Sequence, residues 1–156
     1  YDRWFDALAE RDGDEFDFGV YRSLYVDDDD GHCVEIGGAD DDETETALTG
    51  VFEVVLEVES IAPAESVYRS LGFEVVDRGD ERRRVRLRGP MDLELWEPQL
   101  GIADARGGVH VDFGFRTDDP AAAADAFGDH AVRRESVPAG VRVRDVDGHY
   151  VTFRES

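Results

Sequence analysis

The clearest hydrophobic pattern in the chain lies in residues 51–76, VFEVVLEVESIAPAESVYRSLGFEVV. Apolar and mostly acidic positions alternate over 52–59, which is the period of a strand with one buried face. Over 64–71, apolar residues recur at three- and four-residue spacing, as on one face of a helix. Gly72 favours a helix end because glycine adopts the left-handed conformation easily, and 73–76 is again apolar. The stretch therefore predicts a strand, a helix and a second strand.

The same two periods predict the elements that follow. Polar and apolar positions alternate again in 81–88, where arginines and the residues valine and leucine fall on opposite faces of the expected strand. The same alternation occurs in 91–96 and 109–116. The run PAAAADAF at 120–127 predicts a helix, since proline suits its first turn and an aspartate before it can act as N-cap. Two more strands are expected in the closing segments VRVRD and HYVTF.

Ahead of this pattern, a helix is expected at 2–11 and strands at 18–25 and 32–36. The acidic, polar stretch that follows is expected to be a solvated linker, because a block of like charges repels itself. The expected division of the chain is a partial unit at 1–38, a linker at 39–50 and a module at 51–156.

An internal repeat supports this division. DDDGHCVEI at 28–36 matches DVDGHYVTF at 145–153, each after a helix, a turn and an apolar strand. The repeat predicts a strand–helix–strand–strand–strand unit that occurs twice from residue 51, and once, without its first strand, before residue 38. His32 and His149 follow the two turns and are interpreted as hydrogen-bonded turn histidines.

The charge of the chain is extreme. Its formal net charge is −21, and its 17 basic residues, all of them arginine, face 38 acidic ones. Such a surface argues against nucleic acid as a partner, because nucleic-acid-binding proteins carry basic patches. It favours a halophile's cytoplasmic protein, although a GC-rich genome is an alternative reason for the missing lysine. No apolar run approaches the ~18–20 residues that span a membrane.

The LEV…YRSLGFEVV pattern, its following strands and the final DxDGHxV segment resemble the vicinal oxygen chelate superfamily. This group includes glyoxalase I, bleomycin-resistance proteins and extradiol dioxygenases. The resemblance covers about residues 51–154 as one module and 1–38 as the tail of a preceding one, as in two-module catechol-dioxygenase-like proteins. It implies an α+β fold in which paired βαβββ units form a curved, eight-stranded cup. It also implies a divalent metal, such as Mn²⁺, Mg²⁺ or Fe²⁺, held in the cup.

Carried over position by position, the family's metal ligands fall on acidic residues and on Thr152, which is a poor ligand. An all-carboxylate set suits Mg²⁺, Mn²⁺ or Ca²⁺ better than Zn²⁺. The equivalent of Thr152 in the N-terminal copy keeps a glutamate. The candidate metal ligands are Glu35, Glu53, Glu94 and Asp112, and His110 is the candidate ligand or catalytic base.

Strand alternation also predicts the remaining side chains of the cup. If Phe52, Leu93, Phe113 and Val151 pack against the helices, the arginines and acids of these strands face the opposite way. In one interpretation Arg84, Arg86 and Arg142 bind an anionic substrate there, and Trp96 stacks on it. In the other, the face is a salt-bridged surface covered by another module or chain.

Three functions follow from the resemblance. The first is a glyoxalase- or dioxygenase-like enzyme in which a metal polarises a small vicinal-oxygen substrate. The second is a module that binds a small molecule without catalysis, and the third is a degenerate structural partner of a catalytic module. A homodimer is also expected, since the incomplete first unit needs a strand from upstream residues or from a second chain.

Overall fold

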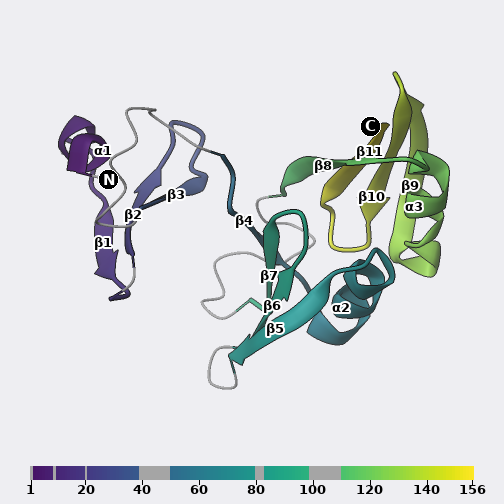
Figure 1. Ribbon diagram of the computed structural model, residues 1–156, viewed down its shortest axis with the longest axis horizontal. Coiled ribbons are helices and arrows are strands. Elements are labelled where there is room, and N and C mark those ends of the chain that lie inside the picture. Colours follow the sequence, from purple (N-terminus) through teal and green to yellow (C-terminus); the bar gives the residue numbers. More distant parts are fainter. Residues whose placement is uncertain (1, 9, 20, 39–49, 80–82, 99–109) are drawn as a thin grey trace. The chain divides into compact units, whose positions relative to one another are not determined.

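The computed structural model describes residues 2–8, 10–19, 21–38, 50–79, 83–98 and 110–156. The chain divides into two compact units, Tyr1–Thr49 and Gly50–Ser156 (Figure 1). The predicted linker lies outside the described residues except for Gly50, as does most of the loop expected at 98–108. No helix in the described part of the chain is long and apolar enough to cross a membrane.

The N-terminal unit contains a helix and three strands. They are α1 (Asp2–Ala7), β1 (Asp14–Asp17), β2 (Arg22–Asp27) and β3 (Cys33–Gly38). The strands form an antiparallel sheet in the order β1-β2-β3. This is the predicted repeat unit without its first strand.

One expectation for this unit is wrong. The strand predicted at 18–25 begins only at Arg22, as β2, and β1 forms at Asp14–Asp17, where no strand was expected. Between them Gly19 has a φ of +79°, and its N–H donates to the Asp17 carboxylate at 2.7 Å. An aspartate side chain that accepts from the backbone two residues on favours a turn over a continuous strand.

The larger unit contains the predicted strand–helix–strand–strand–strand order twice. Its first copy is β4 (Glu53–Glu57), α2 (Ile61–Ser70), β5 (Glu74–Gly79), β6 (Arg84–Arg88) and β7 (Asp92–Trp96). Its second copy is β8 (Asp112–Thr117), α3 (Pro120–Asp125), the 3₁₀ turn η1 (Gly128–His130), β9 (Ala131–Val137), β10 (Gly140–Asp145) and β11 (Tyr150–Glu155).

The two copies have the same sheet topology. Their orders are β4-β7-β6-β5 and β8-β11-β10-β9, and in each the first strand pairs in parallel with the last. The remaining pairs are antiparallel. The expected α+β class with paired βαβββ units is therefore confirmed. Hydrophobic alternation did not locate β9, because this strand is mostly exposed and polar, AVRRESV.

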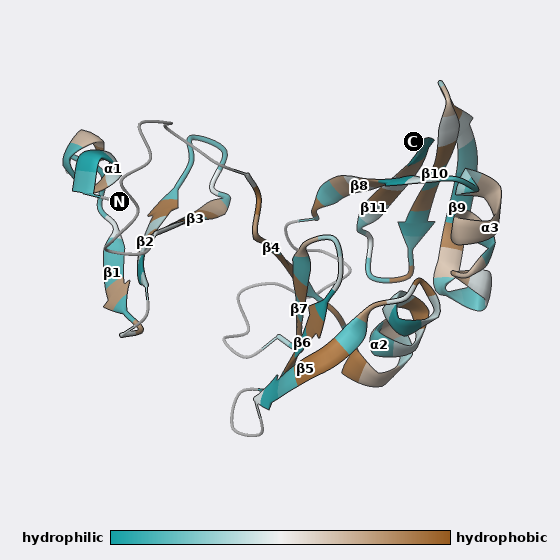
Figure 2. Ribbon diagram, viewed as in Figure 1, coloured by the Kyte–Doolittle hydropathy of each residue, from teal (hydrophilic) through white to brown (hydrophobic). Residues whose placement is uncertain are grey.

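A single hydrophobic core joins the two copies. Leu56, Leu93, Leu95, Val143 and Val151 are fully buried in this core. Figure 2 shows hydrophobic, brown stretches along β4 and β7. Aromatic rings continue the core from one copy into the other through edge-to-face contacts. The rings in this chain of contacts are Tyr68, Phe73, Phe115, Phe127 and Phe153.

This core confirms most of the predicted strand faces. Leu93 and Val151 are buried, and Phe113 packs against the core. Phe52 does not, since it precedes β4 and keeps 43% of its surface exposed. The opposite faces of both sheets therefore carry the charged residues, as predicted.

The repeated DxDGH sequences form the same turn. Asp28 and Asp145 each accept a hydrogen bond at 2.8 Å from the backbone N–H of the histidine four residues later. The glycine before each histidine has a positive φ, +83° at Gly31 and +98° at Gly148. At position 148 an added Cβ would also lie 2.6 Å from the His110 ring, so only glycine fits there.

His149 then joins the two copies of the larger unit. Its Nε2 lies 2.7 Å from the Glu57 carbonyl oxygen, which can only accept. Its Nδ1 lies 3.2 Å from the Val111 N–H, which can only donate. These partners select the neutral ring with its proton on Nε2. Beside it, Asp147 accepts from the Glu59 N–H at 2.9 Å. His149 is thus a hydrogen-bonded turn histidine, as interpreted from the sequence, and so is the exposed His32, whose Nδ1 lies 3.0 Å from the Asp28 carboxylate.

Helix α2 carries a buried carboxylate. Glu65 faces the sheet and is held by both terminal nitrogens of Arg78 on β5, at 2.8 and 2.9 Å. The hydrogen bonds from Arg78 lower the pKa of Glu65 below its ordinary value of 4.5 and outweigh the effect of burial. This pair fixes the helix to the second strand of its copy.

We predict a pH-dependent cost for removing this carboxylate. Because the folded-state pKa is lowered, the stabilisation is fully present above the unfolded pKa and is lost as the pH falls through the folded value. Glu65→Gln should lower the free energy of unfolding by about 1–3 kcal/mol at pH 7. Urea titrations should show this difference shrinking below pH 4.5. A difference that stays constant down to the acid transition would contradict the role given to the ion pair.

Candidate functional site

Arg86 lies at the centre of the charged face of the first sheet. Its guanidinium contacts Glu53 at 2.8 Å and Asp92 at 2.8 Å, and Glu94 at 3.7 Å. Burial on its own would lower the pKa of Arg86, but the hydrogen bond to Asp92 and the three negative charges raise it above its ordinary value. The arginine therefore neutralises acids from β4 and β7 together.

Glu94 makes further contacts on this face. One oxygen accepts from Arg84 at 3.0 Å, and the other accepts from the Trp96 indole N–H at 2.8 Å. Arg84 also pairs with Asp77 of the edge strand β5 at 2.6 Å. The structure thus brings together five predicted residues of the cup, and it joins them as ion pairs and hydrogen bonds. These residues are Glu53, Arg84, Arg86, Glu94 and Trp96.

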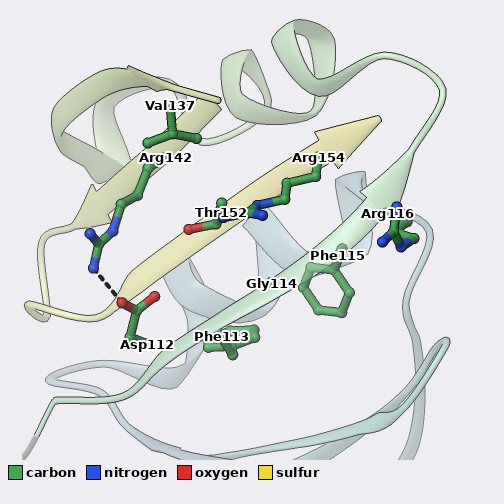
Figure 3. A pocket seen from close by; sticks show the side chains of 9 residues that line it. All are labelled: Asp112, Phe113, Gly114, Phe115, Arg116, Val137, Arg142, Thr152 and Arg154. Carbon is green, nitrogen blue, oxygen red and sulfur yellow. Dashed lines mark hydrogen bonds and ion pairs between the residues drawn. The ribbon is translucent and has the colours of Figure 1, made fainter. Parts of the chain in front are cut away.

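The charged face of the second sheet contains a hollow of ≈470 Å³. Figure 3 shows Asp112 of β8 pointing toward Arg142 of β10, with which it forms an ion pair. Between these strands lies β11, with Thr152 and Arg154. The remaining lining residues are Phe113, Gly114, Phe115, Arg116 and Val137. A volume of this size falls in the range of ~300–1,000 Å³ that is typical of small-molecule sites.

Arginine exceeds acid around this hollow. Among the described residues, Arg116, Arg144 and Arg154 form no ion pair with a carboxylate. Arg142 stacks over the Tyr150 ring at 4.2 Å, with Arg144 at 5.8 Å from the same ring. The Nε atoms of both stacked arginines are buried and have no hydrogen-bond partner in the described part of the chain. In a chain with a net charge of −21, this local positive excess is unusual.

Two predicted site residues lie elsewhere. Glu35 is on β3 of the N-terminal unit, where its carboxylate accepts from the Ser23 hydroxyl. His110 precedes β8 and packs edge-on against His149, with ring centroids 5.8 Å apart. Its Nδ1 is buried without a hydrogen-bond partner among the described residues, and it does not line the hollow.

The predicted ligands Glu53, Glu94 and Asp112 do not suit the metal that this fold implies. Each carboxylate already contacts at least one guanidinium. A divalent cation among them would be repelled by Arg84, Arg86 and Arg142. Thr152 on β11 adds no negative charge. The metal-ligand role of these residues and of Glu35 stays a prediction.

A different set of donors was missed by sequence reasoning. One ring nitrogen or carboxylate oxygen from each of His130, Asp145 and Asp147 lies within 4.8 Å of the other two. Burial raises the pKa of Asp145. Burial acts the same way on Asp147, but His130 and the Glu59 N–H outweigh it and lower its pKa. The repeated DxD sequence was a signal for two of these residues, whereas nothing in the local sequence pointed to His130.

Two βαβββ copies with charged inner faces define the class of fold to which this chain belongs. No family model matches the sequence, and comparison with curated proteins finds no match either. Among solved structures, a lactoylglutathione lyase from Agrobacterium tumefaciens is similar with a TM-score of 0.51. It is 27% identical over 71% of this chain and 96% of that chain.

Two further structures extend the similarity. A provisionally assigned dioxygenase from Bacillus subtilis has a TM-score of 0.68 and 17% identity, and covers 99% of this chain and 58% of that chain. A gene product from Arabidopsis thaliana has a TM-score of 0.55 and 18% identity, over 70% of this chain and 100% of that chain. The chain therefore has the glyoxalase- and dioxygenase-like fold of the vicinal oxygen chelate superfamily, as its sequence pattern predicts.

We predict that Arg86 is the main stabilising residue of the first charged face. Arg86→Ala would leave Glu53 and Asp92 poorly compensated, and should lower the free energy of unfolding by about 2–4 kcal/mol. The control is Arg88→Ala on the same strand, because Arg88 is 67% exposed and contacts Asp92 at 3.6 Å. It should cost no more than about 1 kcal/mol. Equal losses in thermal or urea unfolding would contradict the assignment.

Proposed function

We propose that the unit at 50–156 binds a small organic anion in the arginine-lined hollow of its second sheet. The observation that carries this proposal is the excess of guanidinium groups there. Arg116 and Arg154 line the hollow without a carboxylate partner among the described residues. Arg142 pairs with Asp112 and lies 3.9 Å from Glu135. Guanidinium groups bind carboxylates and phosphates through paired, charge-assisted hydrogen bonds.

The apolar walls of the hollow support an organic ligand over a bare inorganic ion. Val137 lies at its β9 side, and Phe113 and Phe115 border its β8 side with rings that also pack against the core. An added Cβ at Gly114 would lie 2.8 Å from the Thr152 carbonyl oxygen, so no side chain fits at this position of the hollow. A ring or short chain bearing one carboxylate matches this combination of apolar wall and charge.

A metal-dependent enzyme acting on a small vicinal-oxygen substrate is the alternative function. The specific observation in its favour is the similarity to a protein named as a lactoylglutathione lyase. Mn²⁺, Mg²⁺ or Fe²⁺ would then be held by acidic residues of the cup, with His110 as base. Bound metal that is lost in Glu94→Gln would favour the enzyme. The arginine contacts of Glu94 favour binding without this metal.

Three expectations about context stay predictions. A homodimer would supply the strand that the first unit lacks, next to its last strand β3, by analogy with the parallel pairs β4–β7 and β8–β11. A cytoplasmic location and adaptation to concentrated salt are supported by the net charge of −21.

Calorimetric titration with benzoate and salicylate tests the anion site. We expect binding to the 156-residue chain, and a loss of at least about tenfold in affinity in the double variant Arg116→Ala/Arg154→Ala. Both arginines are exposed, so their removal should leave the fold intact.

The matched control is Arg133→Ala on β9. Arg133 belongs to the same sheet but pairs with Glu135 and does not line the hollow. Unchanged affinity in the double variant, or equal loss in the control, would show that the hollow is not the binding site. Absence of binding by both probes would count against an aromatic carboxylate as the ligand class.

A further inference from the structure

Two buried carboxylates meet where the two copies of the larger unit join. Asp145 and Asp147 each keep only 2% of their surface exposed. Asp145 accepts from the His149 backbone N–H, and Asp147 accepts from the Glu59 backbone N–H. Within the described part of the chain no arginine forms an ion pair with either acid. Buried charge of this kind requires a cationic partner or a bound metal.

The His130 ring lies close to this pair of carboxylates, and its distance from Asp147 bears on whether the two residues bind each other directly. Its Nε2 lies 3.6 Å from an Asp147 oxygen, which is too long for a hydrogen bond. Two ligands of one ion, each about 2.1 Å from it, are separated by about 3.4 Å in a tetrahedral site. The Nε2 atom is buried and has no hydrogen-bond partner among the described residues. Its position therefore suits a shared ion better than a direct contact.

Tyr68 gives an independent sign of a missing partner. This residue of α2 is 1% exposed, and its hydroxyl has no hydrogen-bond partner in the described part of the chain. The hydroxyl lies within the electrostatic influence of both Asp145 and Asp147. A buried hydroxyl normally has a partner, so this one points to a ligand in the neighbourhood of the phenol and the two carboxylates.

The cluster has a route to solvent. His130 lines a second hollow of ≈460 Å³. Its walls come from α2, with Val67 and Ser70, and from the segment after α3, with Phe127 and Asp129. An ion can therefore reach the imidazole side of the cluster without unfolding of the core.

We propose that His130, Asp145 and Asp147 form a divalent-cation site at the junction of the two βαβββ copies. Two carboxylates and an imidazole suit a first-row transition ion such as Zn²⁺ or Mn²⁺ better than Ca²⁺ or Mg²⁺, because imidazole is a poor ligand for hard cations. The three ligands come from the second copy, and Tyr68, with its unpartnered hydroxyl, belongs to α2 of the first. The site is separate from the arginine-lined hollow and from the acidic residues of the cup.

Calorimetric titration of Zn²⁺ into chelator-treated protein tests this site. The complete chain is used at about 1 M KCl, so that screening suppresses weak binding to the acidic surface. We expect one tight equivalent and a rise in the thermal unfolding midpoint, since an ion that binds only the folded state stabilises it. His130→Gln should weaken binding about 10- to 100-fold, and Tyr68→Phe should weaken it less while preserving the core.

The exposed turn of the first unit is the matched control. Asp28, Asp30 and His32 also form a group of donors, but all three are exposed. His32→Ala should leave the tight equivalent unchanged. The proposal is wrong if His130→Gln and Tyr68→Phe both retain full affinity, if His32→Ala removes the binding, or if the wild-type chain binds no Zn²⁺ or Mn²⁺. Circular dichroism of His130→Gln separates a lost ligand from a lost fold.

Discussion

The structure of the larger unit depends on one buried imidazole. His149 follows the turn between β10 and β11, donates to the Glu57 carbonyl and accepts from the Val111 N–H. These bonds reach the end of β4 and the start of β8, the first strands of the two copies. Around them the aromatic core continues from Tyr68 to Phe153. The ring therefore sets how one βαβββ copy packs against the other, and with it the positions of both charged faces.

Those two faces use the same residue types differently. On the first sheet Arg84 and Arg86 form ion pairs with acids of the same sheet, so the positive and negative charges of this face neutralise one another. On the second sheet the acids are fewer and several guanidinium groups remain available. Because a charged group binds an outside ligand only if no internal partner already neutralises it, the second face is the better binding surface. The large acidic excess of the chain is thus absent where binding is proposed.

Much of this arrangement could be predicted from sequence because it depends on local patterns. Alternation placed Glu53, Arg86 and Glu94 on one face, and the repeated DxDGH sequence identified the same turn in two units. The repeat also indicated that His149 is a hydrogen-bonded turn residue. These features depend on strand period and on turn chemistry, which neighbouring residues determine.

Other features depend on contacts between distant segments, and sequence alone could not supply them. β9 has almost no buried positions and thus no hydrophobic period. The carboxylates predicted to bind a metal contact arginines of the same sheet, on the next strand or the one beyond it, which follows from strand order and register and not from residue type. His130 reaches Asp147 only because η1 and the β10–β11 turn lie together in the fold. Its sequence neighbourhood gives no sign of this.

The most direct test is the ¹⁵N NMR spectrum of the His149 ring in the 156-residue chain. We expect a neutral ring with its proton fixed on Nε2, slow to exchange with solvent, and an unprotonated Nδ1. A ring that carries its proton on Nδ1, or that exchanges rapidly between the two tautomers, would show that His149 does not hold the two copies together.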